Sequence, residues 1–101
     1  MNRYLSGVFA QQLDSGAYRQ VFDEGVLVSL DRSNNAVRAS YTLNPIANRI
    51  WMLLDGQRRG EEICDLLALE FDADPDVIAA DLIELLQQLE RLGLITPVLQ
   101  T

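Results

Sequence analysis

The sequence has few of the side chains on which enzymes and metal sites depend. Its 101 residues include no His, and Cys64 is the only cysteine. Without His, the side chain that most often performs general acid–base catalysis at neutral pH is missing. One Cys cannot form an internal disulfide, and without His it supplies no set of metal ligands. No glycine-rich phosphate-binding loop is present either. We therefore expect a protein that is not an enzyme and that holds no metal or cofactor.

The sequence also lacks long apolar segments. No apolar run approaches the ~20 residues that a membrane-spanning helix needs. The first 16 residues contain a short, interrupted apolar patch and lack the apolar region and cleavage site of a secretory signal. The length suits one domain, and a hydrophobic fraction of 49% is enough for a core without disulfides. We expect a cytoplasmic protein with no membrane partner.

Lys is absent too, and the charge is unevenly distributed. Residues 1–59 hold seven Arg and five acidic residues, a balance of +2. Residues 60–101 hold Arg91 alone against ten acidic residues, a balance of −9. An acidic second half repels phosphate, so we do not expect nucleic acid as a partner. The acidic surface either keeps a small domain soluble or attracts a basic partner segment.

Three segments of the first half have the pattern of strands, at residues 18–22, 26–31 and 36–43. The connections between them are short, which predicts an antiparallel meander in which the third strand is an edge. Alternation along the third strand predicts two faces. One face carries Val37, Ala39, Tyr41 and Leu43, and the other carries Arg38, Ser40 and Thr42.

At Asn44 the apolar period changes from two to 3.6, which predicts a helix directly after the third strand. Asn44 can cap this helix, Pro45 suits its first position, and Asp55-Gly56 would end it. Two further helices are predicted over about 60–71 and 76–92, and Asp74 and Pro75 suit the cap and the first position of the second of them. The predicted fold class is therefore α+β: a three-stranded antiparallel meander followed by three helices, winged-helix-like.

Single residues in the helices have structural interpretations. Cys64 lies in a helix beside Ile63 and Leu67, so we interpret it as a small buried hydrophobic residue. Trp51, the only Trp, either anchors the core or forms one wall of a binding groove.

The predicted edge strand is the most informative feature for function. An unpaired edge offers N–H and C=O groups to an extended peptide, and residues 36–43 contain only Arg38 and no Pro to deter such pairing. The sequence permits strand addition, in which backbone bonds give affinity and alternate side chains give specificity. A covered or merely solvated edge is the equally open alternative.

The order of these signals resembles the coenzyme PQQ synthesis protein D (PqqD) family, also described as the RiPP precursor peptide recognition element. The similar stretches are "GVLVSLD", "YTLNPIANRIWMLLDG" and "EEICDLLALEFDADPDVIAADLIELLQQLERLGLI". The family usually has a tight Gly-containing turn between the second and third strands, whereas "DRSNNAVRAS" is longer and has no Gly. The resemblance defines a domain over 18–96. Residues 1–17 are then an N-terminal extension that is flexible, extends the sheet or mediates a dimer, and 97–101 are a tail. The matching residues are Tyr41, Leu43, Asn44, Ile50, Trp51, Leu53, Leu54, Gly56, Glu62, Ile63, Asp81, Leu82, Gly93 and Leu94.

The resemblance implies a non-catalytic protein that binds the leader segment of a ribosomally made precursor peptide. In this family the leader adds as an antiparallel strand to the third strand and lies beside the third helix. The domain presents the precursor to a modifying enzyme, which is a radical SAM enzyme or a leader peptidase and cyclase. A winged-helix-like regulatory module and a dimerisation module, in which two edge strands pair, are the alternatives.

The resemblance also selects candidate peptide-binding residues. The backbone candidates on the third strand are Val37, Arg38, Ala39, Ser40 and Tyr41. On the third helix, the candidates on one flank of the apolar stripe are Asp81, Leu85 and Gln88, and the other flank, with Ile83 and Leu86, stays open. Asp81 has the alternative role of capping a local hydrogen-bond network.

Overall fold

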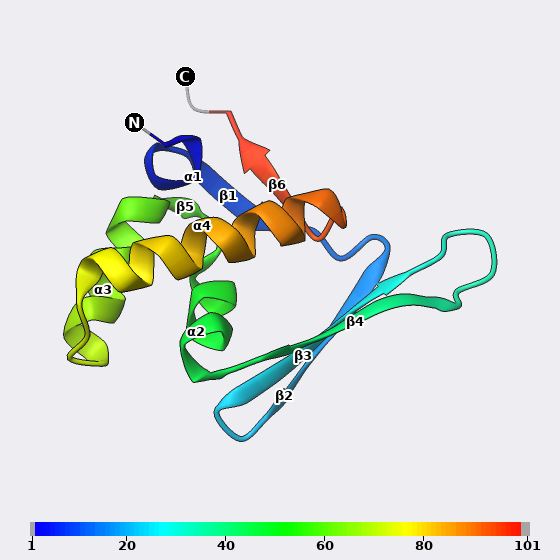
Figure 1. Cartoon of the computed structure of the whole chain (residues 1–101). Helices are drawn as coiled ribbons and strands as arrows, with labels where there is room; N and C mark the ends of the chain where they lie inside the picture. The colour runs from blue at the N-terminus through cyan, green and yellow to red at the C-terminus, as the bar shows by residue number, and fades with distance from the viewer. Residues whose placement is uncertain (1, 100–101) are drawn as a thin grey trace.

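The computed structural model describes residues 2–99 of the chain. Within them lie two three-stranded antiparallel sheets and four helices, so the α+β prediction is confirmed (Figure 1). The description as winged-helix-like holds only loosely, because a second sheet is present. Residues 1, 100 and 101, which belong to the predicted extension 1–17 and tail 97–101, lie outside the described residues.

The predicted meander is present, with its strands in the order β2-β3-β4. Leu27 pairs with Tyr18 on one side and with Tyr41 on the other. Asn35, in the connection between β3 and β4, has a φ of 58°, a left-handed conformation that Asn tolerates. A register shift between Ser29 and Leu30 marks a bulge near the start of β4. The strands are β2 (Gly16–Val21), β3 (Glu24–Leu30) and β4 (Val37–Leu43).

The three predicted helices follow the meander, and the first and third of them begin at the expected caps. The Asn44 side chain accepts a hydrogen bond from the Ala47 N–H at 2.8 Å, and the Asp74 side chain accepts one from the Asp76 N–H at 2.8 Å. Both helices have Pro at the first position, where its missing N–H is not needed. The helices are α2 (Pro45–Leu53), α3 (Gly60–Glu70) and α4 (Pro75–Arg91).

The core lies where α2, α3 and α4 meet the inner face of the meander. Trp51 is 1% exposed and its ring lies 5.7 Å from that of Tyr18, so it anchors the core. Cys64 is buried, and burial raises the pKa of its thiol to about 11, which keeps it protonated at neutral pH. None of the helices in the described part of the chain is long and apolar enough to cross a membrane.

A second sheet, which the sequence did not predict, joins both ends of the described chain. β1 (Val8–Gln11) lies between β5 (Asp55–Arg59) and β6 (Ile95–Val98), and a short helix, α1 (Arg3–Ser6), precedes it. Gly56, expected to end the preceding helix, instead lies inside β5 with a φ of +81°. The helix ends earlier, with Leu54 as its C-cap.

The two sheets occupy different sides of the helical body. In Figure 1, α4 lies between the two sheets. The sheet of β1, β5 and β6 is on one side of it, and the meander β2-β3-β4 is on the other side and extends away from the helices. The N-terminal segment therefore joins the second sheet and does not extend the meander. As a result, β1 does not cover the outer edge of β4.

A polar cluster ties the first turn of the chain to the end of α4. Arg3 donates two hydrogen bonds to the Glu90 carboxylate, at 2.7 and 3.0 Å, and the Tyr4 hydroxyl donates a third at 2.8 Å. The bonds from Arg3, followed by that from Tyr4, hold the pKa of Glu90 below its ordinary value of 4.5. The ionised carboxylate is therefore the form that the folded protein favours.

Replacing Glu90 with Gln removes this charge. Because the pair is partly exposed, we expect the free energy of unfolding to fall by up to about 1 kcal/mol at neutral pH. A lowered carboxyl pKa stabilises the fold above the unfolded-state pKa, and this stabilisation is lost as the pH falls through the folded-state pKa. In urea denaturation, the difference between wild type and Glu90→Gln should therefore shrink as the pH falls from neutral to below 4.5, with the exposed Glu24→Gln as control. A difference that stays the same over this whole pH range contradicts this assignment.

Candidate peptide-binding groove

The outer edge of β4 carries free backbone groups. In an antiparallel sheet, the N–H and C=O groups of successive residues point alternately to the two sides of the strand. The Leu30 N–H bonds Ser15 at 2.7 Å on the β2 side, and the Asp31 N–H bonds Ala36 at 2.7 Å on the β4 side. Val28 therefore faces β2, and so its partner Ser40 has its backbone groups directed away from β3. Within residues 2–99, β4 pairs with β3 alone.

The five strand candidates differ in what they present. Ala39 and Tyr41 use their backbone groups on β3 and are half-buried on the inner face of the sheet. Ser40 is exposed and directs its N–H and C=O to the free edge, as does Thr42, which was not among the candidates. Val37 is 62% exposed at the start of the strand, beside Arg38 and the bulge.

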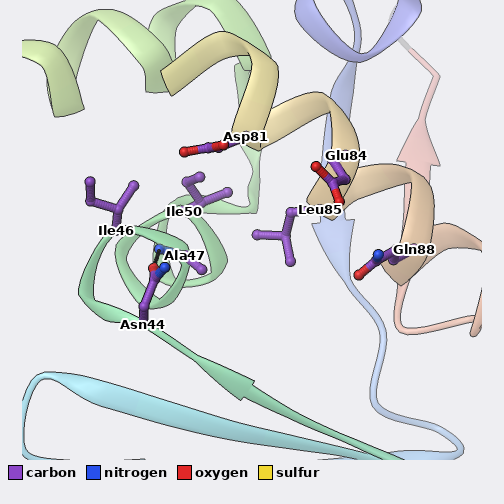
Figure 2. Close-up of a pocket in the computed structure, with 8 residues that line it drawn as sticks. All are labelled: Asn44, Ile46, Ala47, Ile50, Asp81, Glu84, Leu85 and Gln88. Carbon is purple, nitrogen blue, oxygen red and sulfur yellow. Dashed lines mark hydrogen bonds between the residues drawn. The ribbon is translucent and has the colours of Figure 1, made fainter. Parts of the chain in front are cut away.

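A hollow of about 220 Å³ lies between α2 and α4, next to the end of β4 (Figure 2). The three helix candidates Asp81, Leu85 and Gln88 meet in it. Leu86 is instead fully buried in the core and Ile83 does not line the hollow, so this opening belongs to the flank with Asp81. The lining is completed by Asn44, Ile46, Ala47, Ile50 and Glu84.

The contribution of α2 was missed in the sequence. Ile46 and Ile50 are spaced i, i+4 and share one face of the helix, but periodicity does not say what that face meets. The signal was the absence of any loop between β4 and α2. Because Asn44 alone joins them, the first turn of α2 must stand beside the end of β4.

A second hollow, of about 280 Å³, lies near the C-terminus of α4 and the start of β4. Arg38 lines it, apart from the other candidates. The sequence could not place this hollow, because part of its wall comes from the segment that β1 positions. Its lining residues are Gln12, Ser15, Ser29, Leu30, Arg32, Arg38, Glu90, Arg91, Leu92 and Gly93.

A buried amide fixes the meander against α2. Asn48 is 2% exposed, accepts a hydrogen bond from the Tyr18 hydroxyl, and donates one to the Asp23 carbonyl at 3.5 Å. Gly25 lies against both side chains, and a Cβ there would stand 2.3 Å from the Asn48 Oδ1. The small residue at this position of β3 therefore permits the close approach.

The outer edge of β4 and the hollow at each of its two ends are together called the groove, and they have the chemistry of a binding surface. Among residues 2–99, no three His, Cys, Asp or Glu side chains gather into a group that could hold a metal ion. The groove offers backbone groups along β4, apolar wall from Ile46, Ile50 and Leu85, and charged side chains at both ends. These are the elements that an extended peptide needs for strand addition.

Comparisons with known proteins agree with this geometry. The structure of TbiB1 in complex with the TbiA(beta) leader peptide is similar to this chain, with a TM-score of 0.68 and 26% sequence identity. The similarity covers 90% of this chain and 99% of that one. A search of curated proteins finds no match. The model of the family coenzyme PQQ synthesis protein D (PqqD) matches residues 24–95. The chain therefore belongs to the PqqD family, and the resemblance found in the sequence is confirmed.

The Tyr18–Asn48 bond gives a prediction for stability. Replacing Tyr18 with Phe leaves the buried Asn48 carbonyl without its donor, which should lower the free energy of unfolding by about 1–2 kcal/mol. Tyr41→Phe is the matched control, because no side-chain hydrogen bond of Tyr41 is found within residues 2–99. We expect the control to change stability by less than about 0.5 kcal/mol in urea denaturation. Equal effects of the two variants would argue against the role assigned to Tyr18.

Proposed function

We propose that this protein binds the leader segment of a ribosomally synthesised precursor peptide and presents the precursor to a modifying enzyme. The leader adds as a strand to the outer edge of β4 and inserts side chains between α2 and α4. The observation that carries this proposal is the free β4 edge beside the groove. Family membership supports it, as does the likeness to TbiB1, whose structure contains a leader peptide.

The energetics require both parts of the site. Micromolar affinity corresponds to roughly −8 kcal/mol. Each backbone hydrogen bond contributes only about 1 kcal/mol net, and ordering a disordered leader opposes binding. Apolar leader side chains must therefore supply much of the affinity. The half-buried Leu85 and Ile46 offer these side chains an apolar surface that is already partly shielded from water.

The role in biosynthesis is non-catalytic. Holding the leader raises the effective concentration of the precursor at the partner enzyme without any reactive group on the carrier. The partner is a radical SAM enzyme, or a leader peptidase and its cyclase, and co-purification with each distinguishes them. We place the protein in the cytoplasm, where a ribosomally made precursor is released.

Two other functions fit the groove less well. Docking α4 on DNA would bring Asp76, Asp81 and Glu84, all exposed, against phosphate. Homodimerisation through β4 would use the same edge as the leader. The two are then mutually exclusive, and light scattering would show a dimer that dissociates when the leader binds.

A proline on the free edge tests the proposal. In Ser40→Pro the lost N–H points away from β3, so the fold should survive while strand addition is blocked. With a synthetic leader peptide that binds the wild-type protein, we expect the dissociation constant to rise about tenfold or more. Ser40→Ala keeps the N–H and should bind as wild type. Isothermal titration calorimetry gives the affinities.

A second control uses the opposite edge of the same sheet. Gln20 of β2 faces Gly25, so its N–H also points away from β3, and Gln20→Pro should leave the affinity unchanged.

In NMR titration, the amide signals of residues 36–42 and 78–89 should shift when the leader is added. If Ser40→Pro binds as tightly as wild type, the leader does not add to β4.

A further inference from the structure

The two ends of the groove carry opposite charge. In the hollow between α2 and α4, the charged lining residues are Asp81 and Glu84, both exposed. In the hollow at the other end, Arg32, Arg38 and Arg91 stand against Glu90 alone. The groove is therefore negative where β4 ends and positive where β4 begins.

Apart from Glu90, these charged residues form no ion pair among residues 2–99. Glu90 is bound by Arg3 and Tyr4, which leaves the arginines as the unpaired charges of the positive end. Arg32 donates to the neutral Ser15 hydroxyl. The Asp31 carboxylate accepts hydrogen bonds from Ser33, and its pKa is lowered first by these bonds and also by the nearby Arg38, with which it forms no ion pair. The ion pairs found between residues 2 and 99 include none of Asp81, Glu84, Arg32, Arg38 and Arg91.

The direction in which a peptide pairs with β4 decides which end of the peptide meets which charge. The meander is antiparallel throughout, and antiparallel pairing is slightly more stable per residue than parallel pairing. A peptide that continues this pattern on β4 has its N-terminal end near Asn44 and its C-terminal end near Arg38. At ~3.3 Å per residue, the six steps from residue 38 to residue 44 span about 20 Å. That distance exceeds the Debye length of ~8 Å at physiological salt, so each end acts separately.

We propose that the groove selects peptides by charge polarity. The preferred segment has basic residues at its N-terminal end, an extended apolar centre of about six residues, and acidic residues at its C-terminal end. This inference rests on the proposed function, including an antiparallel peptide, and adds to it the charge pattern of that peptide. A peptide with the reverse pattern places like charges together at both ends, which weakens binding.

Three synthetic peptides test the polarity. Each has the same palindromic apolar centre, so that only the flanks differ: Lys-Lys before and Glu-Glu after, Glu-Glu before and Lys-Lys after, or Gln at all four positions. We expect the first to bind about tenfold more tightly than the second at low salt, with the Gln peptide between them. In 1 M NaCl the three affinities should converge.

Variants of the protein assign the effect to the two ends. Asp81→Asn with Glu84→Gln should weaken binding of the first peptide and strengthen binding of the second, so that the ratio of their two affinities falls. Arg32→Gln with Arg38→Gln should do the same at the other end. Two control variants remove exposed charges outside the groove lining: the double variant Asp65→Asn with Glu24→Gln, and the single variant Arg19→Gln. Both should leave the ranking of the three peptides by affinity unchanged.

The outcomes separate this inference from the proposed function. Two results together would reject the charge polarity and leave strand addition standing. The first is that Ser40→Pro abolishes binding of the Gln peptide, and the second is that the wild-type protein binds the two charged peptides equally. A preference for the second peptide overturns the antiparallel orientation. If none of the three peptides binds while the leader does, the charge polarity is rejected and strand addition stands. If the leader does not bind either, both proposals are rejected.

Discussion

The structure depends on one junction, at which a strand becomes a helix without a loop. Asn44 is the single residue between Leu43 and Pro45, and its side chain satisfies the Ala47 N–H at the start of α2. Because the cap holds α2 directly against the end of β4, the apolar face with Ile46 and Ile50 is brought opposite Leu85 of α4. A flexible linker here would let the helix move, and the hollow beside the strand would have no fixed shape. A single side-chain cap thus connects the sheet that offers backbone groups with the helices that offer apolar surface.

The second requirement is that the chain leaves β4 unoccupied. The N-terminal arm, residues 3–11, consists of α1 and β1. The backbone of β1 is hydrogen-bonded to β5 and β6, and Arg3 and Tyr4 of α1 donate hydrogen bonds to Glu90 at the end of α4. Gly60 shows how closely this arm is packed, because a Cβ there would stand 1.9 Å from the Tyr4 carbonyl oxygen. The arm is therefore held on the far side of α4 by specific contacts. Had it paired with β4, the groove would be filled by the protein itself.

The sequence predicted the elements whose signals are local. The meander and the three main helices were found from periodicity and from the caps Asn44 and Asp74, and the candidates chosen on one flank of α4, Asp81, Leu85 and Gln88, line a common hollow. The second sheet was missed because β1 and β6 have four residues each, and β5 has the sequence DGQRR with no apolar alternation. These strands are defined by partners far away along the chain. The basic end of the groove was missed for the same reason, since Gln12 and Ser15 reach it only through the position of β1.

The pairing of β1 with β6 also has a consequence for how the protein is made. Val8 lies opposite Val98, so this contact closes nearly the whole chain, and contacts of such long range are associated with slow folding. During synthesis, β1 leaves the ribosome long before either of its partners. The meander, the α2 junction and α4 all precede β6 in the chain, but the second sheet, which holds the N-terminal segment, cannot be completed until β6 emerges. The segment 3–11 therefore acquires its fixed place, away from the edge of β4, only after β6 has been translated.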